Sequence, residues 1–494
     1  MKKAILIVVV IVASVIVYIS YNNKPTQSSD SQSCNCSNTW FPHSQTPNTN
    51  DGAGGPFDTD STSNCMFHQL AVQKFLWLTR TLPNGHPYFQ DSLIQVNILL
   101  AKPKPQLGLS LVLIDTLQAG SSGTLKSNPA FAANGKTSYM VYYSKFVNDT
   151  LYNDCTRFAT FLSQSDSLAQ RNSNNYEFSN GALETKASWI NVDAIKKEEQ
   201  ANYYTTEAAV WVNNSYQKQT VALLGLHVAT KVINHPEFIW ATFQHHGMAP
   251  YHDWTTRDTN TTANNDYLFF AKGTTHDVQG ISWFNNQHGK DSVLPTPYQA
   301  FSVYKYGTMV TTGGGYIDTT SQGAKGDALN FNNIDAINTS LQSQLKKEND
   351  VWSNYMYNGA IWLNTDKKTK EQIDSLIHSF EGTIEINKGA FSRGSLAAMN
   401  ITMETYRQVF QSLNKTQATF NDVGNCFGCH NGQTMFPYAN NVVDTGTSPL
   451  YFSHIFNHYL RSYSQTNRDN ELPAKKHDNK NDAAAFIKKK QKPQ

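Results

Sequence analysis

The sequence predicts an α+β fold: one large body of mixed strands and helices, followed by a mainly helical C-terminal segment. Four stretches rich in β-branched and aromatic residues, bounded by Gly, Pro or Asn, predict strands at 92–101, 109–115, 137–146 and 220–233. Four others repeat apolar residues at spacings of three and four and predict helices at 67–79, 150–164, 348–362 and 395–413. No repeat of about 20 to 50 residues is evident, which argues against a solenoid or propeller.

The chain begins with a segment that directs it to the membrane. Two lysines precede an unbroken apolar or small-residue run over 4–19, whose length lies between that of a signal peptide and that of a spanning helix. No small-residue cleavage site follows, and Tyr18 and Tyr21 are bulky, so we expect an uncleaved anchor over 1–22, with 4–21 in the membrane. A cleaved signal peptide is the alternative. Either way we expect a periplasmic or otherwise extracytoplasmic protein.

The composition divides the remaining chain into four parts. These are a flexible tether (23–39), the α+β body (40–384), the C-terminal helical segment (385–465) and a disordered, lysine-rich tail (466–494). The formal net charge is only +2, and the body has no basic block. Nucleic acid is therefore not expected as a partner.

The most specific motif is CFGCH, at 426–430. Cys426 and Cys429 have the spacing that adds two thiols to the vinyl groups of haem c, and His430 follows as an axial ligand of the iron. A thioredoxin-like pair would be expected after a strand in a βαβ unit, and a disulfide closing so short a loop stabilises little. The motif therefore predicts one covalent haem c per chain, with His430 as proximal ligand.

Two later histidines, His454 and His458, leave two questions open. Together with Cys426 and Cys429 they could form a zinc Cys2His2 site, but the 24 positions between the two halves are about twice the usual zinc-finger spacing. On a helix the two histidines would share one face. We assign His454 as the distal iron ligand, with an open or water-bound position as the alternative.

The other four cysteines are expected to form disulfides outside the cytoplasm. Cys34 and Cys36 are too close in sequence to bridge easily, which favours pairing of one or the other with Cys65 or Cys155. The pairing stays open.

The stretch 222–252 is rich in histidine. It contains His227, His235, His245, His246 and His252. On a strand, His245 and His246 point to opposite faces and cannot easily bind one ion. We expect His227 and His245 to be hydrogen-bonded core residues beside Trp240, with His246 and His252 exposed. The alternative is a second metal site, which Glu237 could complete, or a haem-facing distal residue.

Taken together, the chain resembles a family of exported bacterial proteins of uncharacterised role that carry a single C-terminal c-type haem motif, within the c-type cytochromes. The stretches that carry the resemblance are 65–79, 222–250, 348–362, 395–410 and 426–430. It implies haem attachment at Cys426 and Cys429 and iron ligation by His430, and it implies no substrate. The family pattern has "EH" and "NAP" after "WATF"; this chain has "QHHGMAP", so Gln244 cannot supply a negative charge.

These observations predict an extracytoplasmic mono-haem c-type cytochrome that transfers single electrons. The partners would be a redox protein or a small-molecule electron donor or acceptor, and the membrane through the N-terminal anchor. A haem enzyme with an open distal site for peroxide or O2 is the alternative, and a binding module with a structural or sensory haem is a third. No catalytic residue is assigned.

Overall fold

The computed structural model describes most of the body and a few short stretches beyond it. The described residues are 34–41, 51–59, 62–97, 99–118, 124–164, 178–252, 260–262, 264–273, 275–277, 303–304, 322–363, 365, 368–369, 371–372, 392–394 and 400–403. Within them, strands and helices are mixed, which confirms the α+β class. The expected helical C-terminal segment falls mostly outside these ranges.

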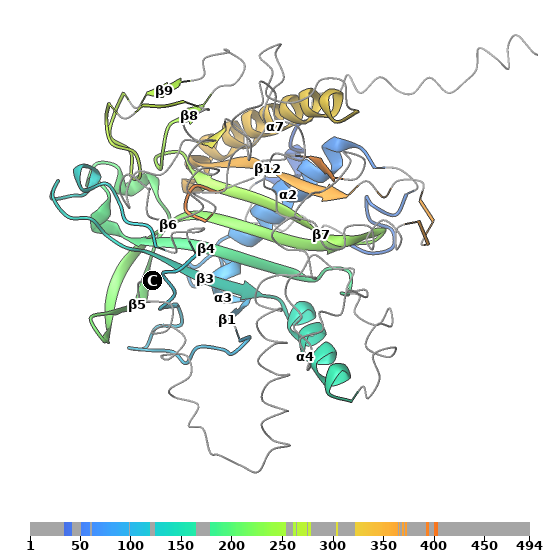
Figure 1. The fold of residues 1–494 in the computed structure, drawn as a ribbon, viewed down its shortest axis with the longest axis horizontal. Helices are drawn as coiled ribbons and strands as arrows, with labels where there is room; N and C mark the ends of the chain where they lie inside the picture. Colours follow the sequence, from blue (N-terminus) through green and yellow to red (C-terminus); the bar gives the residue numbers. More distant parts are fainter. Residues whose placement is uncertain are drawn as a thin grey trace, which may run out of the picture.

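One nine-stranded sheet organises this part of the chain (Figure 1). Its strands are β1 (Ile94–Val96), β2 (Val112–Leu113), β3 (Val141–Val147), β4 (Leu183–Asn191), β5 (Thr205–Val212), β6 (Ser215–Val232), β7 (His235–His245), β12 (Tyr355–Leu363) and β13 (Ser392–Gly394). The order is β1-β3-β4-β6-β7-β12-β13, with β5 paired to β6 and β2 to β5. All pairings are antiparallel except that of β2 with β5.

The remaining regular elements are helices and two small strand pairs. The helices are α2 (Asn64–Thr79), α3 (Tyr88–Asp91), α4 (Asp149–Gln164) and α7 (Gln322–Lys347). Short 3-10 turns occur at η1 (Asn38–Trp40), η3 (Pro129–Phe131), η4 (Val192–Ala194), η5 (Gln200–Asn202) and η9 (Val351–Asn354). β9 (Asn260–Thr262) pairs with β10 (Thr275–Asp277), and β8 (Tyr251–His252) with β11 (Val303–Tyr304).

The longest strand, β6, links two parts of the sheet. Its 18 residues pair with β5 at the start and with β4 and β7 further along. The hairpin to β5 turns at Asn213 and Asn214, whose φ angles are 49° and 66°. A two-residue loop with positive φ at both positions matches the right-handed twist of the strands, and Asn tolerates that conformation.

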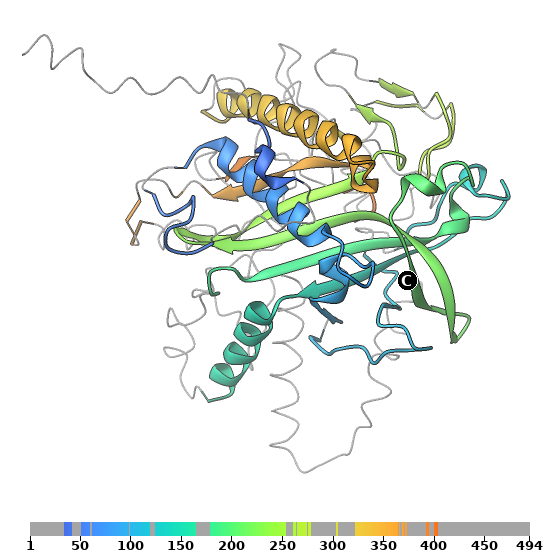
Figure 2. The same ribbon diagram turned by 180° about the vertical axis from the view of Figure 1, so that it is seen from behind.

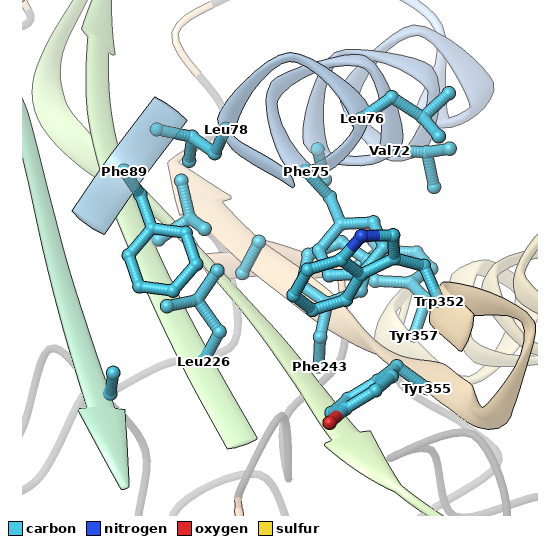
Figure 3. Close-up of a cluster of buried hydrophobic side chains, with 14 of the residues drawn as sticks. Val72, Phe75, Leu76, Leu78, Phe89, Leu226, Phe243, Trp352, Tyr355 and Tyr357 are labelled. Carbon is cyan, nitrogen blue, oxygen red and sulfur yellow. The ribbon is translucent and has the colours of Figure 1, made fainter. Parts of the chain in front are cut away.

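Helices α2 and α7 cover one face of the sheet, called here the first face (Figure 2). Ser63 caps the start of the α2 helix, and its hydroxyl accepts a hydrogen bond from Met66 N at 3.3 Å. Figure 3 shows the aromatic and aliphatic side chains from α2, β6, β7 and β12 that meet beneath it. Phe67 stacks on Trp362, and Phe75 on Phe243, each pair with ring centroids 4.1 Å apart. Such buried aromatic pairs stabilise the layer beyond their area alone.

The opposite side, the second face, is also shielded from water. At one end Tyr143 and Leu224 pack in a second cluster with Ile401 and Met403. At the other end lies α4, which carries the buried Cys155. Burial raises the pKa of this thiol, and the charge of Glu184 on β4 raises it further. The sheet therefore needs covering layers on both sides.

The helix predicted over 348–362 is wrong. Residues 351–354 form a 3-10 turn and 355–363 form β12, between β7 and β13. A strand buried on both faces is apolar almost without interruption, and such a run also satisfies a spacing of three and four. The aromatic residues in this stretch favour the strand, and Gly359 lies where the register with β7 shifts.

Other boundaries also differ from expectation. The strands expected over 92–101 and 109–115 are reduced to three and two residues. The helices over 67–79 and 150–164 are confirmed and begin slightly earlier, at Asn64 and Asp149. Of 395–413, only 400–403 is described, and it forms a turn.

The N-terminal part of the described chain is packed. Cys34 and Trp40 are 1% and 7% exposed, so the flexible tether expected over 23–39 does not include the residues from 34 onward. None of the described helices is long and apolar enough to cross a membrane. The expected transmembrane helix is therefore not found among the described residues; the segment over which it was predicted, 1–22, lies outside them.

One of the open cysteine pairings is realised. Cys34 and Cys65 form a disulfide across 31 positions. Cys36 and Cys155 are free and buried, so the expectation that all four would pair is wrong. The disulfide fastens the N-terminal stretch to the first turn of α2, while Cys36 N donates to Ser340 Oγ on α7 at 3.1 Å.

Asn338 of α7 offers a test of the first-face packing. Its side chain accepts a hydrogen bond from Tyr357 N at 2.9 Å and donates one to Tyr357 O at 2.6 Å. These two bonds take the place of the bonds that a neighbouring strand would make with the Tyr357 backbone. We expect Asn338→Ala to lower the free energy of unfolding by about 3 kcal/mol, since two buried backbone groups lose their partner. Urea denaturation measures this. Ser343→Ala, at an exposed position of the same helix, should change it by less than about 0.5 kcal/mol; equal effects would contradict the prediction.

Candidate functional site

The residues assigned to haem lie outside the described ranges. Cys426, Cys429, His430 and His454 all follow residue 403, the last described position. The described residues therefore inform the site in two ways. They place most of the histidines of the body, and they show where residues 400–403 contact the sheet.

His245 is a structural histidine. Its Nδ1 accepts from Gly247 N at 3.0 Å, so the other ring nitrogen, Nε2, donates to Asn202 O at 3.0 Å. The ring stacks on Tyr203 with centroids 3.5 Å apart. Burial holds the pKa of His245 well below its usual value, and the charge of the neighbouring His246 acts in the same direction. It is a neutral, fully bonded side chain, as the sequence predicted.

His235 and Glu237 form a buried pair at the hairpin between β6 and β7. His235 Nδ1 lies 3.0 Å from Glu237 Oε1, and this oxygen also accepts from Leu363 N at 2.8 Å. The two side chains are 2% and 0% exposed. A buried carboxylate requires such partners, and here they join the start of β7 to the end of β12. The H-x-E spacing places both residues on one side of a strand, a signal that the sequence reading did not use.

His68, on α2, lies in the interior between the helices and the sheet. Its Nε2 donates to Asn330 Oδ1 at 2.6 Å, and its Nδ1 accepts from Tyr357 Oη at 2.7 Å. Complete burial lowers the pKa of His68 to about 3, although the bond to Asn330 acts in the opposite direction. The imidazole is therefore neutral at physiological pH and connects α2, α7 and β12.

The alternative of a second metal site in the histidine-rich stretch is wrong for the residues that are described. Among them, no group of three or more His, Cys, Asp or Glu side chains is placed to hold a metal ion. Glu237 is engaged by His235 and the backbone, and the exposed His246 faces Asn354 O at 3.0 Å. The side-chain surroundings of His252 are outside the description. For the described residues, the expectation of metal binding is therefore wrong.

A row of polar side chains crosses the second face, and the sequence reading missed it. Lys145, Lys186, His227 and Thr242 lie opposite one another on β3, β4, β6 and β7. Lys145 Nζ is 2.9 Å from Asp115 Oδ2. Burial disfavours ionisation of Asp115, but the charges of Lys145 and Lys186, with the hydrogen bonds to the carboxylate, outweigh it and lower its pKa. The alternation of polar and apolar residues along each strand was the signal that could have indicated these side chains. Which of them lie opposite one another depends on the strand register, and one sequence does not reveal that register.

The described part defines an α+β protein built on a mainly antiparallel sheet that is shielded on both faces. Comparison of the chain with models of protein families, with curated proteins and with solved structures found no match in any of the three.

His68 gives this fold a defined acid sensitivity. Because burial lowers the pKa of His68 from its ordinary value of 6.5 to about 3 in the folded state, its contribution to stability is complete above pH 6.5 and is lost as the pH falls toward 3. We expect the free energy of unfolding to fall by up to about 1.4 kcal/mol per pH unit from this group within that window. Urea denaturation between pH 7 and pH 4 measures the slope.

The paired variants are His68→Gln and Gln69→Ala. The first should reduce the pH slope, because a neutral amide replaces the titrating ring. The second removes the neighbouring side chain on α2, which carries no titratable group, and should leave the slope unchanged. An unchanged slope in His68→Gln would show that the acid sensitivity comes from other groups.

Proposed function

We propose that this protein is an extracytoplasmic c-type haem protein that transfers single electrons. The observation that carries the proposal is the CFGCH stretch at 426–430. Two thiols at this spacing with an adjacent histidine are typical of covalent haem attachment. The haem, when bound, would supply a one-electron couple whose potential the protein sets through its axial ligands and surroundings.

The disulfide supports the cellular location that this proposal requires. Stable disulfides persist in oxidising compartments outside the cytoplasm, and Cys34 and Cys65 form one. The apolar run near the N-terminus is consistent with export. Both observations bear on location, and neither bears on the identity of the electron donor or acceptor.

The remaining described thiols support a separate role for Cys426 and Cys429. Burial raises the pKa of Cys36 to about 12, although the hydrogen bond with Ser340 acts in the opposite direction. The pKa of Cys155 is also raised well above its usual value. Thiols of this kind are unreactive, since the thiolate is the nucleophile. Covalent chemistry of the chain is therefore assigned to the C-terminal pair.

A count of reactive thiols tests the attachment. If Cys426 and Cys429 form thioethers, the unfolded, reduced protein will alkylate at Cys34, Cys36, Cys65 and Cys155 only, because reduction opens a disulfide and leaves a thioether intact. Mass spectrometry of protein expressed with the c-type maturation machinery counts the modified cysteines, and haem staining on a denaturing gel provides a second readout.

The paired variants are Cys429→Ala and Cys36→Ala. Cys429→Ala should reduce or abolish the covalent stain, while Cys36→Ala should keep it. Six alkylated cysteines in the natural chain, with no stain, would overturn the haem assignment.

The second axial position is assigned to His454. Replacing this residue by alanine should leave covalent attachment intact and shift the Soret band, because the iron would lose one strong-field ligand. His458→Ala is the matched control, since it removes the histidine four positions later and should leave the spectrum unchanged. Identical spectra for His454→Ala and the natural protein would exclude His454 as a ligand.

A further inference from the structure

The described residues expose four large apolar side chains, and all four belong to one segment or to the strand paired with it. They are Leu99, Leu107, Ile114 and Trp211, with exposed fractions of 37%, 57%, 38% and 38%. The first three lie within 99–114, and Trp211 lies on β5, which pairs with β2 of that segment. Single exposed apolar residues are common on protein surfaces, but their restriction to one region marks a place that meets an apolar partner.

Residues 99–111, called here the leucine loop, turn tightly at Leu107 and Gly108. Gln106 N donates to Leu109 O at 3.1 Å, and Leu109 N donates to Gln106 O at 2.8 Å. The φ angles of Leu107 and Gly108 are 52° and 76°. Asn or Gly usually occupies the first position of such a turn, because most side chains are strained at positive φ. Leu107 is therefore unfavourable both in its backbone conformation and in its exposure to water, and a contact outside the molecule would offset both.

The end of the β5–β6 hairpin extends this surface and curves away from the rest of the sheet (Figures 1 and 2). Trp211 and Tyr216 lie opposite each other on the two strands, with ring centroids 4.8 Å apart and planes at 69°. Opposed residues place their side chains on one face of a hairpin. Ile114 directly follows β2, and Trp211 directly follows Val210, the partner of the last residue of β2, so both lie at the same level of the sheet.

The charge of this region is positive. Lys102 and Lys104 are exposed in the leucine loop, and 99–114 contains no Asp or Glu. The two acids that border the region, Asp115 and Glu207, each lie in an ion pair with a lysine. The surface therefore presents exposed apolar groups beside two lysines whose charge no acid within the segment balances.

A lipid membrane fits this combination better than a protein. A projecting turn with one leucine inserts into fluid acyl chains without a complementary pocket, whereas a protein partner would need an opposing cavity. Trp and Tyr are enriched where a membrane meets water, since each ring is largely apolar and carries one polar group. Lysines extend their charged ends toward lipid phosphates, which strengthens binding to anionic lipids.

We infer that the leucine loop and the end of the β5–β6 hairpin dock on an anionic lipid membrane. Leu107 enters the acyl region, Trp211 and Tyr216 lie at the level of the headgroups, and Lys102 and Lys104 meet the phosphates. This surface determines which side of the body faces the membrane. The inference does not rest on the proposed haem or on electron transfer.

The first test places an environment-sensitive fluorescent amino acid at Leu107 in the full-length chain. With vesicles of phosphatidylcholine and phosphatidylglycerol, its emission should shift to shorter wavelength, because the position leaves water. The same amino acid at the exposed Ser343, on α7 and far from the hairpin end in both views, should show no shift (Figures 1 and 2). A signal read at one residue separates this contact from any vesicle binding by the apolar run over 4–19.

No shift at Leu107, or an equal shift at Ser343, would overturn the inference. A shift at Leu107 without lipid, together with dimer formation, would also overturn it, because the surface would then be an interface between protein chains. Vesicles of phosphatidylcholine alone should give a smaller shift, since the lysines would meet no net negative charge. An equal shift with both kinds of vesicle would reject an anionic membrane as the partner.

The second test uses Leu107→Asn to separate membrane contact from folding. Asparagine suits positive φ, so the free energy of unfolding should not fall. With the fluorescent amino acid at the exposed Ser110, the shift should drop by about half or more, because less apolar surface enters the lipid. Lys104→Gln should also reduce this shift, whereas Lys136→Gln, at an exposed turn elsewhere, should not. A loss of stability in Leu107→Asn, or equal effects of the two lysine variants, would contradict the docking.

Discussion

The structure depends on the burial of both faces of its sheet. Central strands β4, β6, β7 and β12 bury their side chains alternately toward α2 and α7 and toward the second face. A sheet of this kind is stable only when each face has a complete covering layer. This requirement explains why distant segments of the chain, from Cys34 at one end to Met403 at the other, are fixed to one framework.

Polar side chains inside this framework act as connectors. His68 links two helices to β12, His235 and Glu237 link two strands, and Asn338 takes the place of a ladder partner. Each is saturated or nearly so by other protein groups, which is the condition for burying polar atoms without a large loss of stability. The histidine content that suggests metal chemistry in the sequence is used here for internal hydrogen bonding, as far as the described residues show.

The sequence allowed the helices 67–79 and 150–164 to be predicted because apolar residues recur in both at spacings of three and four. The helix predicted at β12 is wrong, because a strand buried on both faces lacks the alternation of polar and apolar residues that would distinguish it from a helix. The pairing of Cys34 with Cys65 was one of several that spacing allowed; only packing against α7 determines that Cys36 stays reduced. The contact between Gly225 and Asn400 depends on a register that no local pattern encodes. The CFGCH pattern at 426–430 can be read directly from the sequence, and because it lies outside the described residues, haem attachment there stays a prediction.

The buried thiol of Cys36 makes correct oxidation depend on the order of folding. Cys34 and Cys36 are two positions apart, so in an extended chain both compete for Cys65. Cys36 is withdrawn from this competition when it packs against Ser340 and Ile337 of α7. That helix lies about three hundred residues downstream. Under the proposed export, a chain that crosses the membrane from its N-terminus would meet the oxidant before α7 has arrived. Correct pairing would then rely on late thiol–disulfide exchange, and an isomerase that reopens a Cys36–Cys65 bond would raise the yield of the native protein.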